Sequence, residues 1–125
     1  MFRPTPAALL RWSMLYFLVG VALGIYMAIS HDFAVRPVHV HVNLLGWVSL
    51  GLAAFVYKAY PAAGASRLAH GHFWISILAL PILLAMLWAF VRGNTAIEPV
   101  LGIASIAILV ATLLLVINVF KNVHD

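Results

Sequence analysis

The sequence predicts an all-α integral membrane protein, a four-helix antiparallel bundle that forms a single domain over residues 1–125. Composition is the first observation behind this prediction: 66% of the residues are hydrophobic and only 8% are charged, against about 45–50% and about 25% in soluble domains. The second is the presence of four apolar runs, each close to the ~20 residues that a helix needs to cross a bilayer. We therefore expect this chain to lie in a lipid bilayer.

The four runs place the spans at about residues 8–29, 38–60, 71–91 and 99–120. The breaks between them contain turn-forming and charged residues such as Asp32, Gly64 and Asn94. Pro37 and Pro99 stand at the entries of the second and fourth runs, where proline costs no helical hydrogen bond. Short breaks of this kind predict antiparallel neighbouring helices.

Positive charge is distributed unequally between the two predicted sides of the membrane. Five cations lie on the side of the termini and two on the other: Arg3, Arg11, Lys58, Arg67 and Lys121 against Arg36 and Arg92. The positive-inside rule then predicts both termini in the cytoplasm, for a multi-pass protein of the bacterial cytoplasmic (inner) membrane. The cations are scattered rather than gathered in one basic patch, so we expect no nucleic-acid partner.

The chain has no cysteine, which excludes disulfides, thiolate metal sites, iron–sulfur clusters and covalently attached haem. Six histidines are the unusual polar residues of such an apolar chain. His39 and His41 lie among apolar residues in the first turn of the second predicted span. They are either interfacial side chains bonded to headgroups and loop carbonyls, or ligands of a transition metal, which neutral imidazole binds well.

The spacing of His39 and His41 restricts the kind of site that they can form. Residues two apart on a helix point about 200° away from each other, so one helix cannot easily hold one ion between them. They can serve two different sites, one on each flank. In a closed ring of identical chains every interface is heterologous, so His39 of one chain could face His41 of the next across a shared cofactor. Asn43, one turn after His39, could orient that ring.

Two further histidines, His70 and His72, repeat the spacing at the start of the third predicted span, ~20 Å or more from the first pair along the helix axes. For His72 two interpretations stay open, a structural hydrogen bond to a neighbouring carbonyl or a second ligand or proton-path role. His31 lies at the exit of the first span, where a cation suits the carbonyl end of the helix dipole.

The stretch Arg36-Pro37-Val38-His39-Val40-His41-Val42-Asn43-Leu44-Leu45-Gly46-Trp47 resembles the second helix of subunit I in the haem–copper oxidase superfamily. It is most similar to the nitric oxide reductase and cbb3-type branches and to short, four-span subunit-I-like proteins. The resemblance covers about 25 of the 125 residues. It implies that a histidine in this turn is an axial haem ligand. The cbb3-like phrase Arg36-Pro37-Val38-His39 selects His39, and the reductase-like phrase from His41 to Leu45 selects His41.

Subunit I of that superfamily has twelve helices in three arcs of four. A four-span chain that resembles one arc implies a homotrimer that reproduces the whole. The chain departs from the family in its catalytic residues, since it has no third histidine suited to a copper centre, no His-Pro-x-x-Tyr motif and no acidic residue inside a span. We therefore do not expect it to reduce oxygen, and the sequence favours a non-enzymatic role without deciding whether the chain is an enzyme.

These inferences predict a membrane protein that binds haem b through His39 and His41 across subunit interfaces, with Asn43 and Arg36 beside the cofactor. Arg36 is suited to a haem propionate, because arginine binds carboxylates with two hydrogen bonds. Electron transfer, or binding and sensing of nitric oxide or oxygen, would follow. The first alternative is copper held by His31, His39 and His41 for oxidase assembly or copper handling, and the second is a structural subunit without a cofactor. The redox partner is not specified by the sequence.

Overall fold

The computed structural model describes residues 1–124, which form helices and turns and no strand. Three of the membrane spans are continuous helices of 25 residues: α1 (Pro6–Ser30), α5 (Arg67–Val91), which contains Pro81, and α6 (Glu98–Asn122). At 1.5 Å per residue each is long enough to cross ~30 Å of hydrocarbon. The all-α class is confirmed, and four helices are long and apolar enough to span a membrane, as the sequence predicts.

The second span runs from Phe33 to Ala59 and is composite. Its parts are a short 3-10 turn, η1 (Phe33–Val35), then α2 (Arg36–His41), a π-helix, η2 (Val42–Ser49), and α3 (Leu50–Ala59). A single helical turn, α4 (Pro61–Gly64), connects it to α5, and a 3-10 turn, η3 (Thr95–Ile97), connects α5 to α6. The sequence pattern of Val42–Ser49, which is almost entirely apolar, did not predict the π-helix.

Helix starts follow from local chemistry. Thr5 and Ser66 precede α1 and α5, and their hydroxyl oxygens accept hydrogen bonds from the backbone N–H groups of Ala8 (3.2 Å) and Ala69 (3.1 Å). Such side chains satisfy donors that have no partner inside the helix. Prolines occupy the first turn of α1, α2, α4 and α6, as expected where the missing N–H costs nothing.

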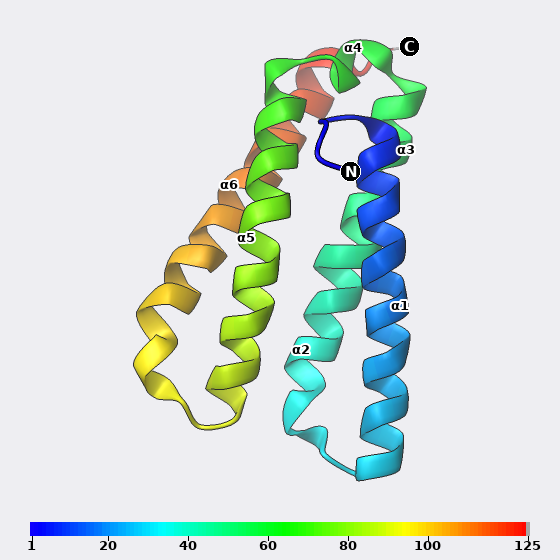
Figure 1. The fold of residues 1–125 in the computed structure, drawn as a ribbon. Helices are drawn as coiled ribbons and strands as arrows, with labels where there is room; N and C mark the ends of the chain where they lie inside the picture. The colour runs from blue at the N-terminus through cyan, green and yellow to red at the C-terminus, as the bar shows by residue number, and fades with distance from the viewer. Residues whose placement is uncertain (125) are drawn as a thin grey trace.

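The four spans are arranged in a row rather than in a closed square (Figure 1). α1 packs along η2 and α3, α5 packs along α6, and α2 brings the second span against α5. Burial agrees with this order. In the most apolar stretch of each span, the share of buried residues is 33% and 28% for the second and third spans but only 17% and 11% for the first and fourth. The outer faces of α1 and α6 are apolar and uncovered, as lipid contact requires.

The two ends of the row differ in what they contain. We call the end with both termini and α4 the terminal end, and the end with η1 and η3 the hairpin end (Figure 1). The antiparallel course of the chain brings Asp32 and Arg92 together at the hairpin end. The assignment of the terminal end to the cytoplasm stays a prediction, as does the assembly of copies into a ring.

Buried side chains between the spans are mostly apolar, with Leu9, Val42, Phe73 and Leu80 among the most covered. Two polar residues are completely buried and cross-link helices through backbone carbonyls. The Ser13 hydroxyl donates to the carbonyl of Trp47 (2.9 Å), and the side-chain amide of Asn118 donates to the carbonyl of Ala63 (3.0 Å). The first bond reaches into the π-helix and joins it to α1.

Candidate functional site

The motif His39-Val40-His41 lies at the hairpin end, where η1 and Pro37 begin the second span. Val38 and Val42 on the same turn of the helix are buried, whereas both imidazoles are half-buried. The two histidines therefore lie at the edge of the packed core. The structure places them on one helix, with ring contacts that differ from each other.

His41 is held by its own helix. Its Nδ1 lies 2.7 Å from the carbonyl oxygen of Pro37, four residues earlier. A carbonyl oxygen only accepts hydrogen bonds, so the ring donates from Nδ1. In the neutral imidazole the lone pair is then on Nε2. A ring oriented by a backbone carbonyl, with Nε2 free, is the usual arrangement of a metal-binding histidine.

His39 turns toward α1 and is held differently. The side-chain amide nitrogen of Asn43 donates to the backbone carbonyl of His39 (2.8 Å) and lies 3.5 Å from Nδ1 of its ring. The first bond fixes the orientation of the amide, so Nδ1 faces an N–H donor and acts as the acceptor. The neutral ring then carries its proton on Nε2. The predicted role of Asn43 beside His39 thus corresponds to an observed contact.

Glycines of α1 make room for these polar side chains. A Cβ atom at Gly20 would lie 2.5 Å from Oδ1 of Asn43, and one at Gly24 would lie 3.3 Å from Cε1 of His39. Glycine at both positions lets the second span carry His39 and Asn43 on the face that packs against α1 without displacing either side chain. The two glycines therefore serve the site as well as the close approach of the helices.

The remaining candidates of the hairpin end do not complete a cluster of metal ligands. Arg36 is exposed, and its guanidinium lies 5.5 Å from the ring centre of Phe33. His31 is exposed at the end of α1, in the left-handed conformation with φ of 55°. Among residues 1–124 no group of three or more histidine, aspartate or glutamate side chains is placed to hold a metal ion. The copper site of His31, His39 and His41 thus has no geometric support within one copy.

A polar cluster that the sequence analysis missed joins α1 to α5 at the hairpin end. Asp32 accepts hydrogen bonds from the hydroxyl of Tyr26 (2.8 Å) and from the guanidinium of Arg92, which also lies 5.0 Å from the ring centre of Trp88. The bond from Tyr26 and the cation of Arg92 hold the pKa of Asp32 below its ordinary value, and bonds to Tyr26 and Asp32 raise that of Arg92. The sequence signal that could have predicted this cluster is the opposite charge of Asp32 and Arg92, which lie in two loops on the same predicted side of the membrane.

The second histidine motif, in the terminal half, separates its two rings. His70 is exposed, whereas His72 is only 4% exposed. Nδ1 of His72 lies 3.2 Å from the hydroxyl of Tyr57, and the two rings meet edge to face at 5.8 Å. This bond connects α3 to α5. The partner of His72 is thus a side chain of another helix rather than the neighbouring carbonyl considered above.

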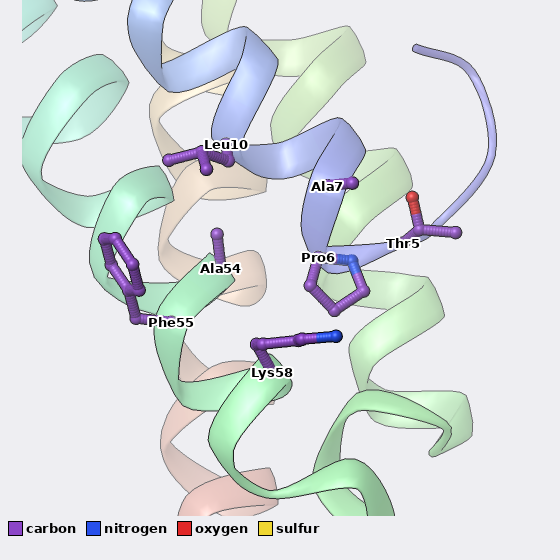
Figure 2. Close-up of a pocket in the computed structure, with 7 residues that line it drawn as sticks. All are labelled: Thr5, Pro6, Ala7, Leu10, Ala54, Phe55 and Lys58. Carbon is purple, nitrogen blue, oxygen red and sulfur yellow. The ribbon is translucent and has the colours of Figure 1, made fainter.

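An open groove of about 310 Å³ lies between α1 and α3 near the terminal end. Figure 2 shows the groove, with Pro6 and Leu10 extending from α1 and Phe55 and Lys58 from α3. Its walls are almost entirely apolar and no histidine lines it. Acyl chains of the bilayer suit such a surface, so the groove adds no chemistry to the site.

Comparisons with known proteins add no relative to this account: no protein-family model, curated protein or solved structure gives a significant match to the chain. The resemblance of residues 36–47 to haem–copper oxidases stays a prediction from the motif. The functional argument therefore depends on the side-chain geometry of this chain.

Proposed function

We propose that the chain is a membrane protein that binds haem b at its hairpin end, with His41 as an axial ligand through Nε2. The observation that carries the proposal is the 2.7 Å bond between Nδ1 of His41 and the carbonyl of Pro37. That bond sets the tautomer and the ring orientation that an iron ligand needs. His41 is half-buried, which leaves its ring partly uncovered.

The second axial ligand comes from another copy of the chain in this proposal. His39 and His41 diverge by about 200° around one helix, so they cannot bind the same iron within one copy. A row of four spans has a different helix at each edge, α1 and α6, and such a unit can form heterologous contacts that close into a ring. A homotrimer with haem at each interface is the simplest assembly of this kind.

The two histidines differ in how well they suit the role. His39 faces an amide N–H at Nδ1, so its free nitrogen carries the proton in the neutral ring. Iron ligation by His39 requires that proton to move to Nδ1 and the side chain of Asn43 to turn away. His41 needs no such change. The geometry therefore favours the ligand that the reductase-like segment from His41 to Leu45 implies, which is His41.

Bound haem would supply reversible one-electron chemistry at its iron, while the chain supplies the rest. His41 would hold the iron, and the exposed guanidinium of Arg36, about one turn away, is suited to a carboxylate at the membrane surface. Two imidazole ligands would favour electron transfer, and loss of one would open the iron to nitric oxide or oxygen.

The test is the absorbance spectrum of the protein purified in detergent after expression with ample haem supply. We expect a Soret band, sharp reduced α and β bands, and a haem content near one per chain. His41→Ala should reduce the haem content at least tenfold, because it removes the ligand that is free to bind. His70→Ala, an exposed histidine near the terminal end, is the matched control and should keep the haem.

A colourless wild-type preparation, or full haem content in His41→Ala, would contradict the proposal. Copper without a Soret band would instead support a copper-binding protein. His39→Ala distinguishes the two ligand assignments: loss of haem supports ligation by both histidines across an interface, and retention assigns both axial positions to His41 of different copies or to another residue.

A further inference from the structure

A second polar site lies inside the membrane-spanning region, apart from the histidines of the hairpin end. It is a cavity of about 70 Å³ between η2, α5 and α6. Its walls are mostly apolar and include four polar side chains, those of Ser49, His72, Ser76 and Thr112. The π-helix contributes to its formation, because η2 supplies one wall and a π turn is wider than an α turn.

Two of the four polar side chains already have partners in their own helices. The Ser49 hydroxyl donates to the carbonyl of Leu44 (2.6 Å), and the Thr112 hydroxyl donates to the carbonyl of Ile108 (2.9 Å). Each hydroxyl oxygen keeps lone pairs that can accept a hydrogen bond. Ser49 and Thr112 therefore present acceptors to the cavity.

The other two side chains have polar atoms without a partner among residues 1–124. His72 bonds Tyr57 through Nδ1 only, and its Nε2 has no hydrogen bond; the same is true of the Ser76 hydroxyl. Both residues are 4% exposed. In residues 1–124 no side-chain nitrogen or oxygen is both fully covered and unpaired, so these two atoms must border free space. The cavity that both residues line provides that space.

The bond to Tyr57 determines which hydrogen-bonding role Nε2 has. A buried tyrosine hydroxyl normally donates a hydrogen bond. The side-chain amide of Asn118 donates to the hydroxyl oxygen of Tyr57, so the hydroxyl donates its own proton to Nδ1 of His72. Nδ1 is then the acceptor, and the neutral ring carries its proton on Nε2. An imidazole N–H without an acceptor inside the membrane would cost about 1–3 kcal/mol.

We propose that the cavity is a water-binding site in which one or two molecules accept a hydrogen bond from Nε2 of His72 and bridge to the hydroxyl of Ser76. The volume is sufficient, since a cavity needs only about 10–15 Å³ of probe space for one water. A buried water needs two to four polar partners, and the oxygens of Ser49 and Thr112 can accept its protons. The site does not depend on haem.

The bound water gives His72 a role that packing alone does not. An imidazole N–H in contact with water can exchange its proton, whereas one enclosed by aliphatic side chains cannot. Ionisable groups inside a membrane are costly and are usually functional. His72 thereby becomes a proton-exchanging group in the terminal half of the row, linked to Tyr57 on one side and to water on the other.

The test is solid-state nuclear magnetic resonance of the full chain, labelled with ¹⁵N-histidine, in phosphatidylcholine bilayers. The signal of His72 is assigned from its absence in His72→Gln. We expect a protonated Nε2, an unprotonated Nδ1 and magnetisation transfer from water to Nε2. Ser76→Val, which fills the space, should abolish this transfer, and Ser76→Ala, which enlarges it, should retain it.

Ser105→Val is the matched control, because Ser105 is exposed on α6 and bonds only the carbonyl of Leu101. It should leave the transfer to His72 unchanged. Exposed His70 gives the reference signal that water is in contact with the protein. Transfer to His70 without transfer to His72 in the wild type would overturn the proposal, as would a proton found on Nδ1 of His72.

Discussion

The chain contains the pattern His-x-His twice, and the fold uses the two copies in different ways. At the hairpin end His39 and His41 are both half-buried, and both rings are held by residues of their own helix. In the terminal half His70 is exposed, and His72 is buried against Tyr57 of another helix. The first motif leaves a ring nitrogen free at the edge of the core, and the second leaves one free inside it.

The difference follows from where each motif lies in the row. At the hairpin end α2 packs against α5, and His39 faces Gly24 of α1 rather than α5. The rings of His39 and His41 both have their hydrogen-bond partners within the second span. Farther toward the terminal end the two spans are bridged by large side chains, including Tyr57 and His72. Identical spacing thus predicts the direction of a side chain but not its partner.

The largest expected effect tests whether the two motifs have separate roles. His41→Ala should lose at least nine-tenths of the bound haem and keep the thermal stability of the haem-free protein, because the hydrogen bond of its ring joins residues of one helix. His72→Ala should keep the haem and lower stability by about 2–3 kcal/mol through a lost buried side chain. Haem content from the spectrum and thermal unfolding in detergent check the pair. Equal effects of both variants on haem would contradict the separation.

The next effect concerns the π-helix that joins the two regions. Gly46→Ala would place a Cβ atom 2.5 Å from Cγ of Tyr16, at the base of a ring that cannot move aside alone. We expect a loss of about 2–3 kcal/mol in the free energy of unfolding, as for other overpacked cores. Denaturation followed by far-ultraviolet circular dichroism measures it.

Gly102→Ala is the matched control, since a Cβ atom at Gly102 of α6 meets nothing within 4 Å. It should be neutral or stabilising by up to ~1 kcal/mol, because alanine favours a helix over glycine. A Gly46→Ala variant as stable as Gly102→Ala would show that α1 and η2 pack more loosely than described here.

A smaller effect is expected for the bond between α3 and α5. Tyr57→Phe leaves Nδ1 of His72 without its donor, and an unpaired buried acceptor costs about 1–2 kcal/mol. Tyr60→Phe, at an exposed tyrosine near the same end, should change stability by less than ~0.5 kcal/mol. The same unfolding measurement compares the two. Equal stability would mean that water replaces the Tyr57 hydroxyl.

The smallest effect is the pH dependence of the hairpin end. The pKa of Asp32 is lowered in the folded state by the bond from Tyr26 and by Arg92, so its ionised form stabilises the fold at neutral pH. That contribution is lost as the pH falls from the ordinary value of an aspartate, ~3.9, through the lower folded value. Asp32→Asn should therefore have a flatter profile of unfolding temperature against pH in this range. If the wild type and Asp32→Asn had parallel profiles, ionised Asp32 would not contribute to the stability of the fold.

Much of the fold was predictable because it depends on composition and local chemistry. Four apolar runs of bilayer length, separated by breaks with Asp32 and Gly64, specify four spans with bounds within a few residues of those observed. The prolines at positions 37 and 99 mark helix starts as expected. The π-helix and the order of the spans in a row were not predictable, since both depend on contacts such as that of Gly46 with Tyr16.

In the candidate site, too, some features follow from local spacing and others depend on contacts between helices. The divergence of His39 and His41 and the place of Asn43 beside His39 follow from helical spacing alone. That Pro37 holds His41 also depends on residues four apart, although spacing by itself does not single out this bond. The partnership of Tyr57 with His72 joins residues of two helices, and no pattern along the chain indicates it.

The sequence by itself determined four helices long and apolar enough to cross a membrane, because the hydrophobic effect acts on composition and length. It also determined which histidines share a turn, because helix geometry is periodic. Only the tertiary structure decided that Nδ1 of His72 meets Tyr57 and where a polar cavity lies. Those features depend on which side chains of different helices meet, and packing brings together residues that no local rule relates.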